Sequence, residues 1–470
     1  MERKSKKRLS EKDVTVVDAK VAKQSVFGTA LGNAMEWFDF GIYSYLAVII
    51  GKVFFPEISG GFQLIYSFAT FAVAFLARPI GGIVFGLVGD RLGRKKVLAI
   101  TLIMMAASTL SIGLIPGYAS IGIAAPILLL TARLLQGFST GGEYAGAMTF
   151  IAESSPDKKR GFLASGLEVG TLIGYICGSG LVTILTLTLG SDTMLAWGWR
   201  IPFFVAAPLG LVGLYFRSKL EETPAFKKMQ ESEQEENKVS FVYIIKTYWK
   251  ELLISMGIVL FFNTMTYFEF TYLPSYLTEQ VGFGESKGLV IILFVMIVMI
   301  PFVILSGYLG DKIGRNKVIV AALIGVIALS IPSFMMFGTA SIVPTFSGVL
   351  LLGIMCAAFE GVLPSLLPSL FFTKVRYGSL ALTFNLSTSL FGGTAPLILA
   401  WLVKKTGNSM APAYYLMVVC GIGLVVMLFF VKETAGRSLR GSKPAIEKKE
   451  ELHTLQPKQA LWWKEEIEKP

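Results

Sequence analysis

Long runs of apolar residues fill the chain from about residue 26 to residue 431, and short polar segments separate them. An α-helix needs about 20 mostly apolar residues to cross the hydrocarbon core of a bilayer. Twelve stretches reach that length, at 26–50, 62–88, 96–117, 122–152, 161–189, 199–217, 250–278, 287–310, 317–338, 342–371, 378–403 and 411–431. We therefore expect an all-α membrane protein with twelve transmembrane helices, several of them tilted or kinked because they are longer than a bilayer requires.

The composition supports a membrane protein and excludes several other classes. Apolar residues make up 53% of the 470 residues and charged residues only 16%, whereas soluble domains carry about 25% charged residues. A cytosolic enzyme or a disordered chain is therefore excluded. Cys177, Cys356 and Cys420 lie far apart in apolar runs, and His453 is the single histidine. We expect no disulfide scaffold, no metal site and no histidine-based catalytic site.

The distribution of Lys and Arg predicts how the chain is oriented. If residues 1–24 are cytoplasmic, 36 of the 43 basic residues lie in inner segments and five in outer segments. Such an asymmetry places both termini in the cytoplasm. The net charge of +11 is then explained by basic inner segments that face an anionic lipid surface. We therefore expect no nucleic-acid partner.

A polar segment in the middle of the chain divides the twelve stretches into six plus six. We expect two six-helix bundles joined by a cytoplasmic linker, with a basic N-tail and a cytoplasmic C-tail. The predicted boundaries are 1–24 for the N-tail, 25–217 for the first bundle, 218–249 for the linker, 250–431 for the second bundle and 432–470 for the C-tail.

One motif occurs in both halves. Gly86–Lys96 follows the second stretch, and Gly307–Lys317, with the same glycine and aspartate spacing, follows the eighth, 221 residues later. Two halves that share a motif at the same inner loop are related by an axis along the membrane normal. Such repeats place a substrate site between the halves, near the bilayer midplane.

These motifs resemble those of the major facilitator superfamily, whose loop signature matches residues 86–95 and whose fourth-helix motif matches Arg133–Gly137. Closer similarity to the metabolite–proton symporter family, and within it to the proline/betaine transporters, lies in Gly32–Phe40, Gln136–Glu143, Gly198–Phe203, Leu220–Pro224 and Ala413–Met417. The resemblance covers about residues 20–440 and implies a multi-pass protein of a bacterial plasma membrane. Residues 432–470 lack the long coiled coil of osmosensing relatives, so osmosensing by that device is not expected.

Ionisable residues inside apolar stretches are candidates for function, because a charge in lipid costs several kcal/mol unless it is paired or solvated. Glu36 and Asp39 fall near the middle of the first stretch, on one helical stripe with Phe40 and Tyr43. We interpret the stripe, together with Trp37, as a proton carrier beside a cation-binding wall. The alternative is a structural hydrogen-bonded cluster.

Arg133 lies in the middle of the fourth stretch, with Tyr144 on roughly the same face. Its guanidinium can hold a carboxylate in a bidentate fork or change partners as a carboxylate is protonated. The alternative is a fixed buried salt bridge with Glu36 or Asp39.

Three further acids in or near the apolar stretches have candidate roles. Glu168 and Glu360 are candidate proton relays. Glu269, beside Tyr267 and other rings, suits an ammonium ligand through cation–π attraction. Aromatic core packing is the alternative for this segment.

The paired loops are expected to act as a conformational gate rather than to contact substrate. The resemblance implies that their contacts latch the inner side and break when the halves rock. The candidate gate residues are Arg78, Gly86, Asp90, Arg91, Gly93, Arg94, Gly307, Asp311, Gly314 and Arg315.

Together these features predict a secondary active transporter that moves a small zwitterion with a proton by alternating access. No Walker sequence is present, so direct ATP coupling is not expected. The proton is the coupling ion, no other cofactor is expected, and a single chain is the expected transport unit. The alternatives are a proton symporter for carboxylates such as citrate, 2-oxoglutarate or shikimate, and a sensor that keeps the carrier fold without transporting.

Overall fold

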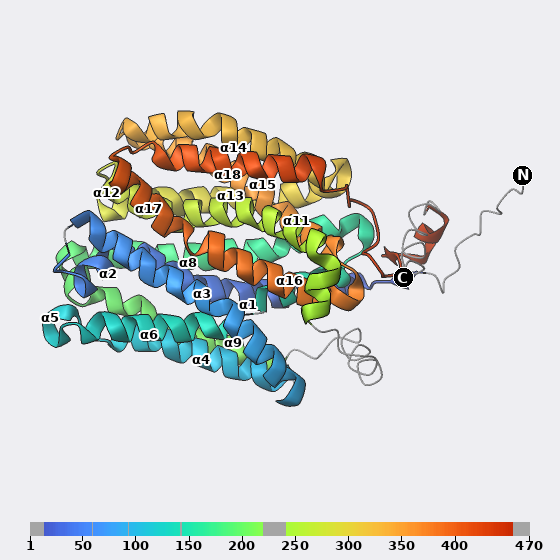
Figure 1. The fold of residues 1–470 in the computed structure, drawn as a ribbon, viewed down its shortest axis with the longest axis horizontal. Helices are drawn as coiled ribbons and strands as arrows, with labels where there is room; N and C mark the ends of the chain where they lie inside the picture. The colour runs from blue at the N-terminus through green and yellow to red at the C-terminus, as the bar shows by residue number, and fades with distance from the viewer. Residues whose placement is uncertain (1–13, 59, 93, 142, 220–240, 455–470) are drawn as a thin grey trace, which may run out of the picture.

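The structure is a computed structural model that describes residues 14–58, 60–92, 94–141, 143–219 and 241–454. Long helices run side by side in one bundle (Figure 1). The helices before the linker are α1 (Ala19–Tyr45), α2 (Ala47–Phe54), α3 (Gly60–Leu92), α4 (Arg94–Leu114), α5 (Tyr118–Ile121), α6 (Ala124–Ser139), α7 (Glu143–Glu153), α8 (Arg160–Ala196) and α9 (Ile201–Lys219). Those after it are α11 (Phe241–Tyr267), α12 (Leu273–Glu279), α13 (Glu285–Ile313), α14 (Arg315–Gly338), α15 (Ile342–Leu366), α16 (Thr373–Ser387), α17 (Ala395–Thr406) and α18 (Ala411–Phe429).

Several predicted spans are interrupted rather than continuous. The first bends by 58° between α1 and α2, and the fourth divides into α6 and α7 after Ser139. Single π-helical segments at Phe268–Tyr272 and Thr388–Gly392 interrupt the seventh and eleventh. Short π segments locally replace the regular hydrogen bonding of an α-helix and are frequent at functional sites.

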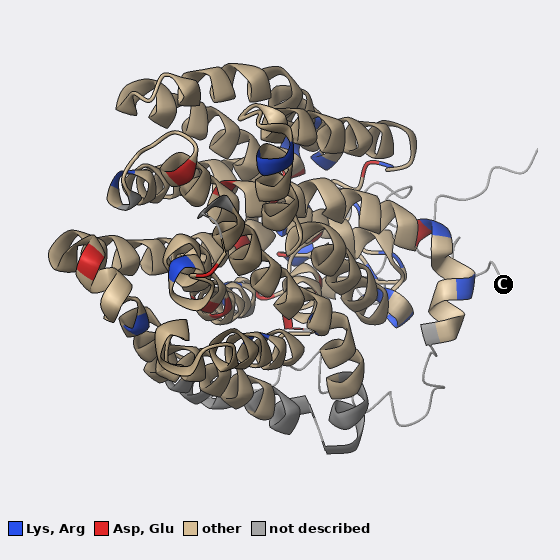
Figure 2. Ribbon diagram, turned by 60° about the vertical axis from the view of Figure 1, so that its left-hand side comes forward, with Lys and Arg blue, Asp and Glu red and all other residues tan. Residues whose placement is uncertain are grey.

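Within the described residues, eight helices are long and apolar enough to cross a membrane, or nine if the bent pair of α1 and α2 counts as one span. Most of the ribbon carries no charged residue (Figure 2). The all-helical membrane fold is thus confirmed, whereas twelve spans and cytoplasmic termini stay predictions.

The described chain begins and ends at the same end of the bundle. Strands β1 (Thr15–Val16) and β2 (Ala445–Ile446) pair there in parallel. We call this end, which carries the start of α8, the end of α13 and the start of α16, the terminal end. The opposite end, formed by α2, α5, α12 and the end of α17, is the far end (Figure 1).

The two halves touch most closely where glycines allow backbones to approach. Near the terminal end, a Cβ atom on Gly307 of α13 would lie only 2.6 Å from the carbonyl oxygen of Gly161 in α8. That distance is shorter than van der Waals contact, so any side chain here would push the halves apart. Small residues at helix interfaces serve the same purpose in membrane bundles generally.

Candidate functional site

A cluster of aromatic rings fills the centre of the bundle, where the halves meet. Helices α1, α3 and α8 supply its first-half rings, and Tyr267 at the end of α11 with the adjoining π segment supplies the rest. Tyr267 lies 5.9 Å from Trp37 and 5.3 Å from Phe75 between ring centroids. We define this central aromatic cluster as Trp37, Phe71, Phe75, Tyr175, Tyr267 and Phe270. All six rings are buried, so the centre is closed to both ends.

Polar groups without partners lie on the segment that supplies the second-half rings. The Tyr267 hydroxyl and both carboxylate oxygens of Glu269 are buried and have no hydrogen-bond partner among the described residues. A buried polar group left unsatisfied costs about 1–3 kcal/mol, and a charged group costs more. An acid kept in such a place calls for a proton, a water or a bound cation.

A buried ion pair joins α1 to α3 next to this cluster. Arg78 Nη2 lies 2.8 Å from Glu36 Oε1, and both side chains are almost fully buried. The guanidinium carbon of Arg78 is 5.5 Å from the centre of the Phe75 ring. The structure therefore places Arg78, a candidate gate residue of the sequence, against the central cluster.

Arg133 and Asp39 belong to a hydrogen-bonded chain instead of an ion pair. Thr109 of α4 donates to Asp39 over 3.2 Å, Gln136 donates to Thr109 over 2.9 Å, and Arg133 donates to Gln136. Arg133 forms no ion pair within 4.0 Å in the described part of the chain. The predicted alternative of a fixed salt bridge to Glu36 or Asp39 is therefore wrong for this conformation.

Arg133 is instead surrounded by rings. Its guanidinium carbon is 4.1 Å from the centre of the Tyr43 ring and 5.4 Å from that of Phe40. Its Nε and Nη2 atoms are buried and have no hydrogen-bond partner among the described residues. Cation–π contacts of this kind are worth about 2 kcal/mol when desolvated, and they hold the cation in place while leaving two donor atoms unused.

A second chain of hydrogen bonds connects Glu168 of α8 to the central cluster. The Tyr144 hydroxyl donates to Glu168 Oε1, and Thr171 donates to Oε2 over 2.7 Å. Asn33 donates to Thr171 over 2.6 Å and accepts a 3.1 Å hydrogen bond from the Trp37 indole nitrogen. Glu168 is therefore linked to the Trp37 ring through three successive hydrogen bonds.

This second chain also faces the other half. The Tyr144 ring stacks on Phe384 of α16, with 4.4 Å between ring centroids. Glu360 of α15 accepts a 3.2 Å hydrogen bond from Thr266, and α15 packs against α8, the helix that carries Glu168. Glu168 and Glu360, predicted separately from the two halves, thus lie on helices that meet across the interface, whereas Tyr144 contacts Glu168 rather than the central rings.

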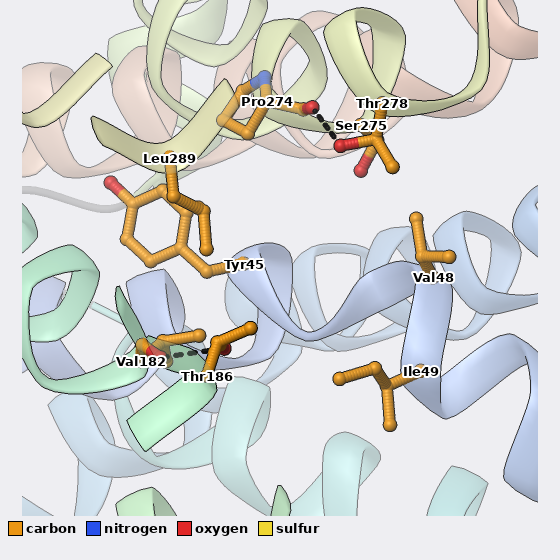
Figure 3. A pocket seen from close by; sticks show the side chains of 9 residues that line it. All are labelled: Tyr45, Val48, Ile49, Val182, Thr186, Pro274, Ser275, Thr278 and Leu289. Atoms are coloured by element: carbon orange, nitrogen blue, oxygen red, sulfur yellow. Dashed lines mark hydrogen bonds between the residues drawn. The ribbon is translucent and has the colours of Figure 1, made fainter. Parts of the chain in front are cut away.

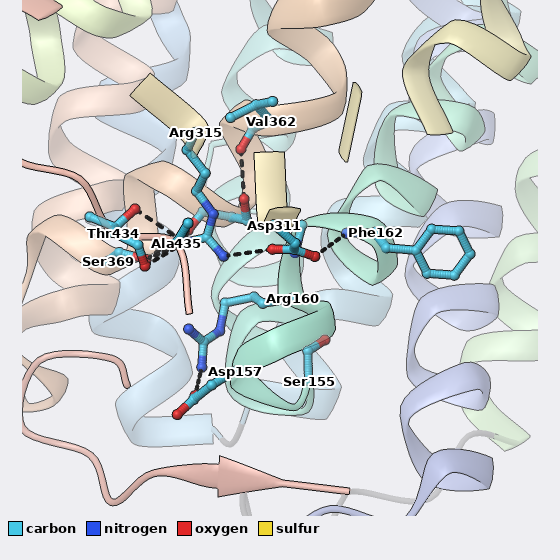
Figure 4. A network of polar contacts seen from close by, with 12 residues as sticks. Ser155, Asp157, Arg160, Phe162, Asp311, Arg315, Val362, Ser369, Thr434 and Ala435 are labelled. Carbon is cyan, nitrogen blue, oxygen red and sulfur yellow. Dashed lines mark hydrogen bonds and ion pairs between the residues drawn. The ribbon is translucent and has the colours of Figure 1, made fainter. Parts of the chain in front are cut away.

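Contacts between the halves close the terminal end (Figure 4). Asp311, at the end of α13, accepts hydrogen bonds from the backbone N–H groups of Gly161 and Phe162, over 2.8 and 2.9 Å, at the start of α8. Asp311 also pairs with Arg315 at 3.2 Å. A carboxylate at a helix N-terminus satisfies free N–H groups and complements the helix dipole. Arg376 of α16 adds an ion pair with Glu153 of α7.

The structure describes the candidate gate residues of the second-half loop, but only part of the first-half loop. Gly307 and Asp311 contact the first half, and Gly314 adopts a φ of 114°, which favours glycine. The side chains of the first-half loop, at Gly86, Asp90, Arg91 and Arg94, and the whole of Gly93 lie outside the described residues. Sequence reasoning missed the ion pair of Glu153 and Arg376, because Arg376 was counted only for orientation and no motif singled out Glu153.

The far end is less tightly closed. A narrow pocket lies between α1, α2 and α8 of the first half and α12 and α13 of the second (Figure 3). Tyr45 lines this pocket, and its ring packs on Tyr175 at 6.2 Å, so the pocket ends against the central cluster. Sequence reasoning also missed Tyr175. The signal for it was the flanking pair Gly174 and Gly178, because small residues indicate a closely packed helix.

Comparisons with known proteins agree with this arrangement. Residues 25–445 match the family described as "Sugar (and other) transporter". The chain is 50% identical over 453 residues to a protein of Staphylococcus haemolyticus, covering 96% of this chain and 97% of that one. It is 45% identical over 453 residues to the "Proline/betaine transporter" of Salmonella typhimurium, covering 95% of this chain and 90% of that one.

A solved structure shows the same fold at lower identity. The proton:xylose symporter XylE bound to 6-bromo-6-deoxy-D-glucose superposes with a TM-score of 0.70 at 18% identity, covering 90% of this chain and 98% of that one. The chain is therefore a multi-pass plasma-membrane transporter, not an enzyme, and it belongs to the family of the proline/betaine transporters within the major facilitator superfamily.

Proposed function

We propose that this protein is a proton-coupled symporter that moves a small zwitterion such as proline or glycine betaine by alternating access. The observation that carries the proposal is the central aromatic cluster, a buried group of rings between the halves, together with an unpartnered acid, Glu269, which precedes Phe270 in the same π segment. Aromatic faces and a carboxylate together attract a quaternary or secondary ammonium group.

The carboxylate of the substrate needs a cation, and two buried arginines are candidates. Arg78 lies against Phe75 with two guanidinium nitrogens unused, and Arg133 also keeps two unused donor atoms. Because Arg78 is paired with Glu36, protonation of Glu36 would free the guanidinium to bind a substrate carboxylate. In this proposal Arg133 holds Tyr43 and Phe40 behind the cluster, and Glu168 and Glu360 carry or relay the proton.

The orientation follows from the charge distribution of the sequence. With the terminal end in the cytoplasm, the conformation described is closed inward by Asp311 and Arg376 and retains pockets at the outer mouth. Rocking of the halves would break the terminal-end contacts and open the central cluster to the cytoplasm.

Uptake into vesicles tests the proposal. Protein in proteoliposomes with an imposed proton gradient, inside alkaline, is expected to accumulate labelled glycine betaine or proline and not citrate. The accumulation should collapse when a protonophore dissipates the gradient. Uptake of citrate alone would support a carboxylate carrier, and ligand binding without uptake or exchange would support a sensor.

A latch variant tests alternating access separately. Asp311→Asn removes the charge that caps α8 and pairs with Arg315, and hydrogen bonds to charged groups are worth about 1.5–3 kcal/mol. We expect the terminal end to open about tenfold more often. In a cysteine-free background, a cysteine at Ser389, whose hydroxyl bonds to Phe75 across the interface, should react correspondingly faster with a maleimide.

Lys312→Ala is the matched control for the latch. Lys312 is the neighbouring residue, it is exposed, and its ammonium lies 5.7 Å from the ring of Tyr308 in its own helix. The labelling rate should stay unchanged in this variant. Equal labelling of Asp311→Asn and the parent would show that Asp311 does not hold the terminal end closed.

A further inference from the structure

A second pocket lies at the far end, beside the one that ends at Tyr45. Its volume is about 320 Å³, which falls within the range of about 300–1,000 Å³ for small-molecule pockets. Helix α3 of the first half and helices α12 and α17 of the second half surround it. Its lining includes Leu64, Tyr272, Tyr276, Glu279, Val403 and Lys404. Ser275 borders both far-end pockets.

Two opposite charges face this pocket from different helices. Glu279 is the last residue of α12, and Lys404 lies in the last turn of α17. No ion pair within 4.0 Å joins them in the described part of the chain. The Lys404 ammonium lies 5.2 Å from the centre of the Phe62 ring. Each charge is therefore available to a ligand, one as an anion and one as a cation.

Two tyrosine rings complete the lining between these charges. The Tyr276 hydroxyl donates a 2.9 Å hydrogen bond to the Ser409 carbonyl, which fixes the ring. Tyr272 closes the inner side, where its ring contacts Phe68 of α3 at 6.2 Å. Tyr272 is also the last residue of the π segment that carries Glu269 and Phe270. The pocket thus adjoins the central cluster through one turn of chain.

We propose that this far-end pocket is a first binding site for the zwitterion, occupied before the central cluster. Lys404 binds the carboxylate, Glu279 attracts the ammonium group, and the tyrosine rings contact its methyl or methylene groups. A zwitterion has no net charge, so the net charge of the protein surface does not attract it. It can be recognised by two opposite charges that are held apart, one for each of its own charged groups. This inference rests on the proposed function and concerns a separate set of residues.

Initial rates of glycine betaine uptake over a range of concentrations test the site. Exposed charge pairs contribute little because water screens them, so Lys404→Ala and Glu279→Gln are each expected to raise KM about two- to fivefold and leave kcat unchanged. Lys405→Ala is the matched control, because Lys405 is equally exposed and adjacent but does not line the pocket. Its KM should equal that of the parent.

A charge swap separates zwitterion binding from general effects of surface charge. Glu279→Lys and Lys404→Glu alone each put two like charges at the pocket and should raise KM. The double variant restores one charge of each sign and should recover most of the parent KM, because the zwitterion can bind in the reversed direction. Recovery would support the site, and a double variant as impaired as the singles would overturn it.

The remaining outcomes distinguish this site from the proposed function. Normal uptake by the parent, with the same KM in both pocket variants and in Lys405→Ala, would overturn the far-end site and leave the central mechanism standing. Absence of glycine betaine and proline uptake by the folded parent would overturn both.

Discussion

Replacing Glu36 by alanine is expected to abolish uptake and to destabilise the protein by about 3–5 kcal/mol, since it leaves a buried cation without its partner. The affected cation is Arg78, which is 1% exposed and lies 2.8 Å from Glu36. Uptake would be measured in proteoliposomes, and stability by thermal unfolding of the purified protein. Asp192→Asn, at an exposed acid of the far end, is the control that should change neither.

A double variant separates the functional role of this pair from its structural role. Glu36→Leu combined with Arg78→Met removes both charges, and replacing a buried ion pair by apolar residues of similar volume is often neutral for stability. We expect the double variant to regain most of the lost stability and still fail to transport. Normal uptake by a stable double variant would show that the pair only holds α1 against α3.

The expectation for Glu36 illustrates how far sequence reasoning reaches. The hydropathy pattern predicted that Glu36 and Asp39 lie deep in the first span, and both are buried. It did not predict their partners, Arg78 on α3 and Thr109 on α4. A helical period fixes which face of a helix a residue occupies, but the helix that covers that face depends on three-dimensional packing.

Helix breaks are missed for a related reason. The stretch at 122–152 is mostly apolar, so its composition predicts one span, yet α6 ends at Ser139 and α7 begins at Glu143. Hydropathy averaged over a window of residues does not detect a change of backbone conformation that spans only three residues. For the same reason it does not detect the π segment at Phe268–Tyr272, although that segment carries Glu269. The acid itself stands out in the sequence, because an ionisable residue in an apolar run is conspicuous whatever the backbone conformation around it.

Contacts between the halves were predicted only where the family resemblance pointed to them. Asp311 was expected at a latch because its loop resembles the loop signature of the major facilitator superfamily, and it does contact α8. Glu168 and Glu360 come from helices with no shared motif, so nothing in the sequence indicated that these helices pack together. Both carboxyl groups are buried at this interface, and burial without a cationic partner disfavours the charged form of a carboxyl group.

Replacing Glu168 by glutamine is therefore expected to uncouple transport from the proton gradient. A gradient of one pH unit corresponds to about 1.36 kcal/mol, or about tenfold accumulation if one proton moves with each substrate molecule and the membrane potential is clamped. The parent should approach that ratio, and Glu168→Gln should reach a ratio of about one. Exchange of labelled for unlabelled substrate, which needs no net proton movement, should persist in the variant.

Thr171→Val is the control that makes this test specific. The Thr171 hydroxyl donates to Glu168 Oε2, and Asn33 donates to it in turn, on the way to Trp37. The valine variant removes this hydrogen bond and keeps the carboxyl group. If Glu168 carries the proton, Thr171→Val slows uptake without lowering the final accumulation ratio, since a coupling ratio depends on which groups are protonated and not on rates. If both variants lose accumulation equally, the hydrogen-bonded structure around Glu168 matters rather than its proton, and Glu168 is not the residue that couples transport to the gradient.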